Sequence, residues 1–524
     1  MSEGEFSVPT QLPRSPVSPT SPAVADHGPT VSAALPDFAL LPVLLVAGLL
    51  TVVLVALSGR YGYHRDELYF IQAGRHLAWG YPDQPPLVPL VARLLTDLAP
   101  GSLVLLRLPS ALLGGLLVVL TGLLTRELGG RQIAQLLAAA IVALAPVVTG
   151  TSHLLSTSTF DLPAWALLCL ILLRILRTGE ARLWLVAGAV AGVALLDTDL
   201  VAFLIFAVVV GLICVGPRGA FRSGWFYAGG AIALALWSGY LVWQGSHGWP
   251  ELSLARSIAA GNSGSSAPWW LIVPEQFVLV PWYFSAVWIT GLVRLFRDPS
   301  LRWCRAVGVA WPILAVLFMA TGGKPYYLAG MFPVLLAAGA QPAVDWVVRA
   351  RSRTRRGLVI AGMAVAVLLM PITLPMLPVS VLHDTPIVAL NYDAGETVGW
   401  PTFVGQIATA FRSLPPDQRG HTIVLTSNYG EAGAVDRFGP ADGLPAAYSG
   451  HNGFWYWGPP PASATTALVV GYDRGQLGFC RNVRLVVRLD NHQNIDDDEQ
   501  GAPVWLCQPS RSWAAIWPSQ RNFG

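Results

Sequence analysis

Residues 38–68 read FALLPVLLVAGLLTVVLVALSGRYGYHRDEL, an uncharged apolar run followed at once by a polar segment. About 20 consecutive apolar residues are needed for a helix to cross a bilayer, and residues 38–58 meet that length. The segment beyond them carries His64, Arg65, Asp66 and Glu67. The stretch therefore predicts a membrane-spanning helix with a cluster of ionisable side chains just beyond its end.

The composition of the whole chain agrees with a membrane protein. Of 524 residues, 53% are hydrophobic and only 12% are charged, whereas a soluble domain carries about 25% charged residues. This excludes a soluble enzyme and a disordered scaffold. The formal net charge is only +3, so no broad basic surface for nucleic acid is expected.

Apolar runs of spanning or near-spanning length recur along the chain. We predict an α-helical polytopic membrane protein with about eleven transmembrane helices, near residues 38–58, 102–125, 133–150, 160–177, 183–197, 199–216, 225–243, 270–293, 306–321, 326–347 and 358–377. Residues 1–37 are rich in Pro, Ser and Thr and have no apolar period, so we expect a disordered tail. The expected membrane domain is 38–378.

The placement of arginine predicts the orientation, because cytoplasmic loops carry an excess of basic residues. One set of loops holds Arg126, Arg131, Arg174, Arg177, Arg182, Arg218, Arg222, Arg294, Arg297, Arg302, Arg305, Arg349, Arg351, Arg353, Arg355 and Arg356. The opposite set holds Arg60, Arg65, Arg75, Arg93, Arg256 and Lys324. The first set is therefore expected in the cytoplasm with the N-terminus, and loops 59–101 and 244–269 are expected outside.

Residues 379–524 are polar and long enough for a small extracytoplasmic domain. A strand pattern at Thr422–Thr426 precedes a helix pattern at Glu431–Phe438, and further strand patterns lie at Ala467–Val470, Val483–Leu489 and Pro503–Leu506. This alternation predicts a small α/β domain. Cys480 and Cys507 are the two cysteines on the outer side, where a disulfide can persist, although two free buried thiols would also fit.

The first outer loop is the strongest candidate for chemistry. Trp79 and Tyr81 there fit an ordinary aromatic belt at the membrane interface. That explanation does not cover the adjacent carboxylates Asp66 and Glu67 beside His64. Consecutive helical residues point about 100° apart, so we expect one carboxylate to face a cavity while the other braces the loop.

Two further residues lie at the same predicted face. Asp161 begins an apolar span, where it could be the helix N-cap, a functional carboxylate, or both. Lys324 is the only lysine in the chain and lies between two spans. It could be an anchor at the interface. Arginine fills that role elsewhere, so a compact ammonium that binds a phosphate is the better explanation.

Together these residues suit transfer from a lipid phosphate. A phosphate leaves as an anion, so it needs cations and no general acid, and one carboxylate base is enough for a single displacement. Glycoside hydrolysis, by contrast, usually requires two carboxylates that flank the bond.

Several segments resemble bacterial glycosyltransferase family 39 of the GT-C superfamily, which includes protein O-mannosyltransferases and aminoarabinose transferases. The similar segments cover nearly everything after residue 38 and are Tyr61–Phe70, Gly80–Leu87, His153–Asp161, Ser246–Pro250, Ala260–Ser266, Gly322–Tyr327, Asn428–Ala432 and Ser449–Asn452.

The resemblance implies an inverting enzyme that uses a polyprenyl-phosphate sugar on the outer membrane face. By the matched positions, Asp66 is the expected base, with Glu67 and Asp161 beside the same cavity. The residues expected near the donor phosphate are Lys324, Tyr326, Tyr327, His64, Arg65 and Arg256. Those expected on the acceptor side, in the outer domain, are His451, Asn452, Trp455 and Trp457.

The chain departs from the family pattern at three places. Asp197-Thr198 stands where Asn-Lys is usual, Gly239-Tyr240 where Pro-Asn is usual, and Glu275 where an apolar residue is usual. One cation is lost and two carboxylates are added, which could mean an unusual donor or acceptor, or a weakened enzyme. The catalytic-loop motif is intact, and this favours activity.

We expect the sugar to be mannose or another hexose and the acceptor to be a protein, a glycolipid or a secreted small molecule. No cofactor is certain, although Asp66, Glu67 and Asp161 could bind a divalent cation; no His/Cys cluster has metal spacing. Two rival hypotheses are a transporter or flippase of lipid-linked sugars and a non-catalytic sugar-binding envelope protein. The absence of a repeated span pattern argues against a transporter, and Phe454–Trp457 would suit sugar binding.

Overall fold

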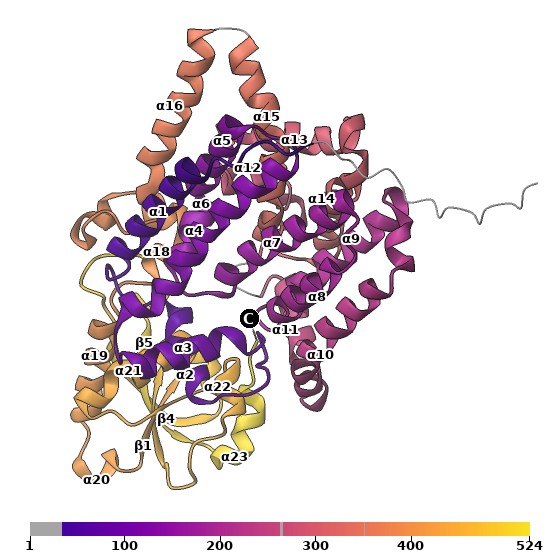
Figure 1. Ribbon diagram of the computed structural model, residues 1–524. Helices are drawn as coiled ribbons and strands as arrows, with labels where there is room; N and C mark the ends of the chain where they lie inside the picture. The colour runs from indigo at the N-terminus through magenta and orange to yellow at the C-terminus, as the bar shows by residue number, and fades with distance from the viewer. Residues whose placement is uncertain (1–33, 263–265, 350–351, 524) are drawn as a thin grey trace, which may run out of the picture.

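The computed structural model describes residues 34–262, 266–349 and 352–523. Figure 1 shows a helical bundle above and a smaller part that contains a β-sheet below, with α15 (Phe332–Arg349) and α16 (Arg353–Leu369) rising from the bundle. The predicted disordered tail lies, up to residue 33, outside the described residues.

Seven helical segments of the described chain are long and apolar enough to cross a membrane. They contain α1 (Leu40–Leu57), α4 (Leu103–Glu127), α7 (Thr157–Thr178), α10 (Gly224–Ser246), η4 with α14 (Pro299–Cys304, Arg305–Thr321), η5 with α15 (Pro325–Met331, Phe332–Arg349), and α16 with η6 (Arg353–Leu369, Met370–Ile372). The bent pair α5 (Gln132–Ala143) and α6 (Pro146–His153), with 58° between its members, makes an eighth if counted as one span. The chain is thus confirmed as a polytopic helical membrane protein.

Eleven spans were predicted, and seven helices of the described chain, or eight with the bent pair, have full spanning length. Helices α8 (Leu183–Ala194) and α9 (Leu200–Val215) are apolar but fall below the spanning length. The predicted span at 270–293 is broken into η2 (Trp269–Leu271), α12 (Gln276–Leu279), η3 (Trp282–Phe284) and the start of α13 (Ser285–Arg297). Pro274 and Pro281 lie at the breaks, and proline removes a helical hydrogen bond and clashes with the preceding turn.

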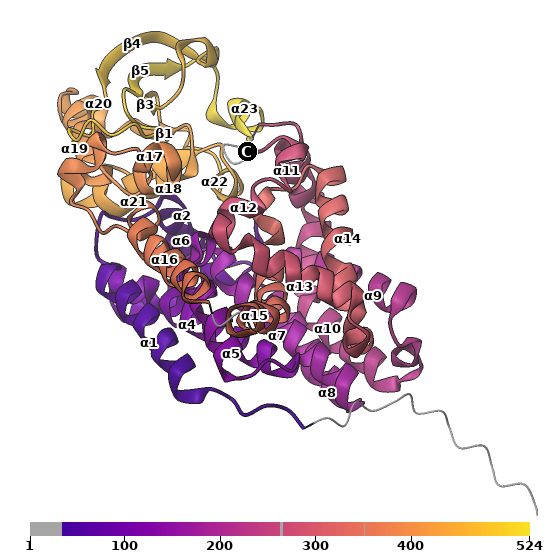
Figure 2. The same cartoon turned by 90° about the horizontal axis from the view of Figure 1, so that it is seen from above.

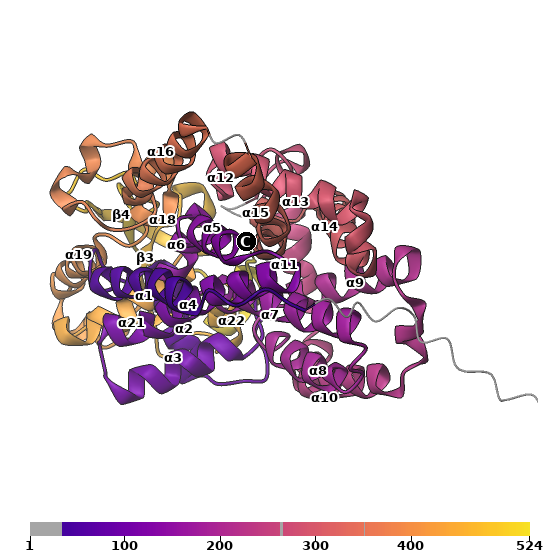
Figure 3. The same ribbon diagram turned by 45° about the horizontal axis from the view of Figure 1, so that its top comes forward.

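Small residues allow the bundle helices to approach closely. Helices α8 and α10 lie side by side (Figure 3). A Cβ on Gly291 of α13 would collide with the Leu335 carbonyl of α15, and a Cβ on Gly339 would collide with the Val287 carbonyl. Close backbone contact through glycine is a common way to pack helices in lipid, where dispersion replaces the hydrophobic effect.

The predicted outer loops contain helices that lie across the end of the bundle. Loop 59–101 contains α2 (Arg65–Arg75) and α3 (Leu87–Leu98), and loop 244–269 contains α11 (Pro250–Ala259). Helices α2 and α3 lie between the bundle and the sheet (Figure 1). A short η1 (Arg218–Arg222) connects α9 to α10.

The C-terminal part holds a mixed five-stranded sheet of order β2-β1-β3-β5-β4. Its elements are η7 (Val379–Asp384), α17 (Ile387–Leu390), α18 (Tyr392–Gly395), α19 (Trp400–Arg412), α20 (Pro416–Arg419), β1 (Thr422–Thr426), α21 (Tyr429–Phe438), η8 (Gly439–Asp442), β2 (Ala447–Ser449), α22 (Gly453–Tyr456), β3 (Thr466–Val470), η9 (Arg474–Gln476), β4 (Cys480–Arg488), β5 (Pro503–Pro509), α23 (Trp513–Ile516) and η10 (Trp517–Gln520). The predicted strands and helix are confirmed, and β2 is an addition. The Cys480–Cys507 disulfide is present.

A hydrophobic cluster joins the first outer loop to the C-terminal part. Leu68, Phe70 and Ile71 of α2 are buried in the same cluster as Val404 and Ile407 of α19. Figure 2 shows the sheet on one side of the bundle, with α21 against α2. The C-terminal part is therefore packed onto loop 59–101 by an apolar interface.

Candidate functional site

The first turn of α2 carries the candidate carboxylates, and its cap explains why the helix begins there. His64 is the N-cap, and its Nδ1 lies 3.2 Å from the amide nitrogen of Asp66. In return the Glu67 carboxylate accepts from the His64 amide at 2.8 Å. This reciprocal capping box fixes Asp66 and Glu67 at the positive end of the helix.

Glu67 is enclosed by donors and does not face a cavity. Its side chain is 0% exposed and forms a bidentate pair with Arg107 of α4, at 2.8 Å from Nε and 2.7 Å from Nη2. The Leu155 amide donates a further bond to it at 3.0 Å. Glu67 therefore braces loop 59–101 against the bundle, and the expectation that it shares catalysis with Asp66 loses its geometric basis.

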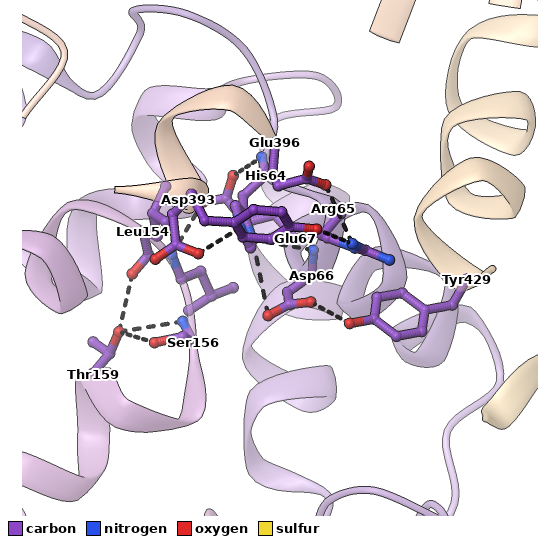
Figure 4. A network of polar contacts seen from close by, with 12 residues as sticks. His64, Arg65, Asp66, Glu67, Leu154, Ser156, Thr159, Asp393, Glu396 and Tyr429 are labelled. Carbon is purple, nitrogen blue, oxygen red and sulfur yellow. Dashed lines mark hydrogen bonds and ion pairs between the residues drawn. The ribbon is translucent and has the colours of Figure 1, made fainter. Parts of the chain in front are cut away.

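Asp66 is the accessible member of the pair, with a side chain that is 36% exposed. Its Oδ1 accepts a hydrogen bond from the Tyr429 hydroxyl of α21 at 2.7 Å. Its Oδ2 lies 3.8 Å from Nδ1 of His64. Figure 4 shows Asp66 between these two side chains, one from its own loop and one from the C-terminal part. One carboxylate oxygen is thus held by Tyr429, while the side chain as a whole stays partly exposed.

His64 lies between two carboxylates. Its Nε2 is 3.5 Å from Oδ1 of Asp393 in α18 (Figure 4). Burial alone would lower the pKa of His64, but the hydrogen bond to Asp393 and the charge of Asp66 outweigh it and raise that pKa to about 9. His64 is therefore a cation at neutral pH, beside the candidate base.

Arg65 has its partners in the C-terminal part. Its Nη1 lies 2.8 Å from Asp498, 3.3 Å from Glu396 and 2.7 Å from the Tyr392 hydroxyl. Its guanidinium also lies 5.3 Å from the centre of the Tyr429 ring. Through these contacts Arg65 joins the first outer loop to the C-terminal part.

Lys324 is a further cation that interacts electrostatically with Asp66. It precedes η5, and its ammonium lies 6.0 Å from the centre of the Tyr326 ring. Burial lowers its pKa, and the charges of Asp66 and Asp393 oppose that shift. Tyr326 and Tyr327 stack edge to face at 5.1 Å. Arg256, by contrast, is exposed on α11.

Asp161 is not the N-cap of its helix. Ser156 caps α7, and Asp161 is the fifth helical residue, 5% exposed. Its Oδ1 and both oxygens of Asp197 make no hydrogen bond within the described part of the chain. Asp161 and Asp197 interact electrostatically. The first family departure thus places a second carboxylate near Asp161.

Gly239-Tyr240 is the second place where the chain departs from the family pattern. The Tyr240 side chain there contacts residues at the start of α9, in α10 and in α11. The Tyr240 hydroxyl lies 3.2 Å from Asp199 and 3.2 Å from Glu251, and it accepts from Gln244 at 2.9 Å. Burial, followed by the charge of Asp199, raises the pKa of Glu251 well above its usual value. Glu275, the third departure, precedes α12. Over the described ranges, no group of three or more His, Cys, Asp or Glu residues could hold a metal ion.

The residues expected on the acceptor side divide into two groups. Asn452 donates to Asp83 at 3.1 Å, and Asp83 accepts from Tyr69 at 2.8 Å, so this part of the C-terminal region contacts the first loop. Trp457 stacks on His76 of α2 at 4.3 Å.

His451 lies beside Tyr429, with ring centres 4.7 Å apart. The Trp455 indole donates to the Trp517 carbonyl at 3.0 Å, and the partly buried ring packs against the hydrophobic core of the C-terminal part.

The sequence analysis missed several residues of the site, and most of them form hydrogen bonds or ion pairs with residues that it did predict. Arg107 was the detectable one, because it is a charged residue inside an apolar run, where ionisable side chains are costly and usually paired. Tyr429, Asp393 and Glu396 come from the C-terminal part, and no local pattern points from them to α2.

Comparison with known proteins shows what the chain is similar to. Residues 83–243 match the family model described as dolichyl-phosphate-mannose-protein mannosyltransferase. A search of curated proteins gives no match. The apo crystal structure of ArnT from Cupriavidus metallidurans is similar with a TM-score of 0.55 and 15% identity, over 89% of this chain and 97% of that chain.

Two archaeal structures score lower. The oligosaccharyltransferase of Archaeoglobus fulgidus tethered with an acceptor peptide has a TM-score of 0.47 and 15% identity, over 78% of this chain and 63% of that chain. AglB of the same organism, in complex with an inhibitory peptide and a dolichol-phosphate, has a TM-score of 0.46 and 14% identity, over 78% and 64%.

The ArnT likeness covers 89% of this chain, so it concerns the fold of nearly the whole chain. The family match covers the region from Asp83 to the end of α10. The chain is therefore a polytopic membrane protein with the fold of ArnT, and its match over residues 83–243 confirms the predicted resemblance to the family of the dolichyl-phosphate-mannose-protein mannosyltransferases.

Proposed function

We propose that the chain is an inverting glycosyltransferase that moves a sugar from a polyprenyl-phosphate donor to an acceptor hydroxyl on the outer face of the membrane. The family match and the ArnT-like fold support the reaction class. The single observation that carries the residue assignment is the contrast within the acidic pair. Glu67 is fully buried and paired with Arg107, whereas the Asp66 side chain is 36% exposed and lies near His64 and Lys324.

In this proposal Asp66 is the general base. Its Oδ2 takes the proton of the acceptor hydroxyl while the acceptor oxygen forms a bond to the anomeric carbon. The bond from that carbon to the donor phosphate oxygen breaks, and its electron pair leaves with the polyprenyl phosphate. A single displacement inverts the anomeric centre.

The leaving phosphate needs positive charge at the position where negative charge develops. Lys324 supplies it in this proposal, because its ammonium lies close enough to Asp66 and Asp393 for their charges to act on it. Tyr326 and Tyr327 flank it on η5. We propose mannose or another hexose as the sugar, and a protein, a glycolipid or a secreted small molecule as the acceptor.

The test is Asp66→Asn in purified protein reconstituted in lipid nanodiscs with a labelled polyprenyl-phosphate hexose. Transfer should fall by at least ~10²-fold, the lower range for loss of a general base, while binding of the labelled donor is unchanged. Asp97→Asn is the matched control, because Asp97 is an exposed carboxylate of the same loop, paired with Arg93 at 2.6 Å. If Asp66→Asn transfers the sugar at the rate of the control, Asp66 is not the general base.

A further inference from the structure

The candidate base is held by a side chain from the other end of the protein. The Tyr429 hydroxyl donates to Oδ1 of Asp66 at 2.7 Å. Asp66 belongs to the first outer loop, and Tyr429 is the first residue of α21 in the C-terminal part. A hydroxyl bond to a carboxylate is charge-assisted, and such bonds are the stronger and more directional ones in proteins.

The backbone before Tyr429 is fixed by its own capping box. Oδ1 of Asn428 accepts from the Glu431 amide at 2.9 Å, and the Glu431 carboxylate accepts from the Ser427 amide at 2.8 Å and the Asn428 amide at 3.2 Å. The start of α21 therefore has a defined position relative to the strand before it.

Glycine then brings α21 against α2. A Cβ on Gly433 would lie 2.9 Å from the Leu68 side chain and backbone, and a Cβ on Gly430 would lie 2.8 Å from Cβ of Arg65. Both distances are shorter than real Cβ contacts. The two helices are thus close enough for Tyr429 to reach Asp66 only because these positions have no side chain.

The ring of Tyr429 is also held on its faces. The Tyr69 ring lies 4.9 Å away, centre to centre, and the Arg65 guanidinium lies 5.3 Å from the ring centre. Burial, followed by the charge of Asp66, raises the pKa of the Tyr429 hydroxyl well above its usual value. Tyr429 therefore keeps its proton at neutral pH and acts as a donor.

We propose that Tyr429 is a positioning residue for Asp66, supplied to the catalytic loop by the C-terminal part. It occupies Oδ1 and fixes the plane of the carboxylate, so that Oδ2 alone is presented to the acceptor hydroxyl. This rests on the proposed role of Asp66 as base and adds a specific function to the C-terminal part beyond covering the site.

The test is Tyr429→Phe, which removes the hydroxyl and keeps the ring between Tyr69 and Arg65. We expect kcat to fall about 10-fold to 100-fold, as for loss of a hydrogen bond to a charged group, with KM for donor and acceptor within about twofold. Because the lost proton stabilised the ionised carboxylate, the acid limb of the kcat/KM profile should move to higher pH. Tyr448→Phe is the control, since Tyr448 belongs to the core cluster on the side of the sheet away from α21.

A double variant separates this proposal from the proposed function. If Tyr429 acts through Asp66, then Asp66→Asn with Tyr429→Phe should be no slower than Asp66→Asn alone. A Tyr429→Phe protein with the kcat and pH profile of the wild type, alongside an inactive Asp66→Asn, would overturn the positioning role and leave the base assignment standing. Normal transfer by Asp66→Asn would instead remove the proposed function. A loss of folding in Tyr429→Phe, seen as early elution or a lower unfolding midpoint than in Tyr448→Phe, would show a structural role and also overturn the proposal.

Discussion

The pair of Glu67 and Arg107 illustrates how burial decides the role of a carboxylate. Both side chains are almost inaccessible, at 0% and 1% exposed. Removing one partner of such a pair leaves an unpaired buried charge, which typically costs about 3–5 kcal/mol, whereas an exposed pair contributes about 0–1 kcal/mol.

We therefore expect Arg107→Met to lower the free energy of unfolding in detergent by about 3–5 kcal/mol. Arg93→Met, which breaks the exposed Arg93–Asp97 pair, should change it by less than about 1 kcal/mol. Adding Glu67→Leu to Arg107→Met should recover part of the loss, since the buried charge is then gone. Equal effects of Arg107→Met and Arg93→Met would contradict the bracing role of Glu67.

The raised pKa of His64 makes the free energy of unfolding depend on pH. Its pKa is raised from 6.5 to about 9, so the folded state binds the proton more tightly than the unfolded chain. The contribution of the His64 charge is therefore fully present below pH 6.5 and is lost as pH rises through about 9.

His64→Asn isolates this effect, because asparagine also serves as an N-cap but carries no charge. Between pH 6.5 and 9 the unfolding midpoint of the wild type should fall more steeply than that of His64→Asn. His492→Asn, at an exposed histidine of the C-terminal part, should follow the wild type. Parallel curves for the wild type and His64→Asn would show that Asp66 and Asp393 do not stabilise the imidazolium.

At the residue scale, the sequence predicted the parts of the site that carry a local signal. The acidic pair after an apolar run and a lone lysine between two spans are such signals, and the structure brings Asp66 and Lys324 close enough to interact electrostatically. Tyr429 and Asp393 carry no such local sequence signal, because their role comes from the packing of α21 and α18 on α2. Which member of the acidic pair is accessible depends on Arg107, whose partner is also set by tertiary packing.

At the scale of elements, β4 and β5 are antiparallel neighbours joined by the Cys480–Cys507 disulfide. The bridge closes a segment that includes Asp498, the partner of Arg65. In the chain-entropy model a crosslink over a segment of this size stabilises by roughly 3 kcal/mol.

Cys480→Ser with Cys507→Ser should therefore lower the stability of the C-terminal part by roughly 3 kcal/mol, measured by denaturant unfolding of the purified protein. Cys169→Ser, at a buried free cysteine of α7, is the control for loss of a thiol. Non-reducing peptide mapping of the wild type should recover the two peptides joined, and two free thiols would remove the bridge.

The elements themselves were largely predictable, since periodicity and apolar length are local properties. The strands at Thr422–Thr426 and Pro503–Pro509 follow the alternation seen in the sequence. Strand β2 has only three residues, too few for a pattern. The break at 270–293 was marked by Pro274 and Pro281, but total hydropathy outweighed them in the prediction.

At the scale of the whole molecule, the orientation proposed from the arginines can be tested by thiol labelling. In a protein with Cys214→Ser, which removes the exposed free cysteine, Asp417→Cys in α20 should react with a membrane-impermeant reagent in intact cells. Thr354→Cys, in α16 next to the arginine cluster, should react only after the membrane is opened. The reverse pattern would invert the orientation and exclude transfer on the outer face.

The contact between Asp66 and Tyr429 has a consequence for biogenesis. The two residues are 363 positions apart, and every described spanning helix except α1 lies between them in the chain. A ribosome thus releases the acidic loop long before its tyrosine partner has been made. On our proposal, a nascent or prematurely terminated chain can insert into the bilayer and still lack a positioned base, so that turnover begins only when synthesis, translocation and docking of the last segment are complete.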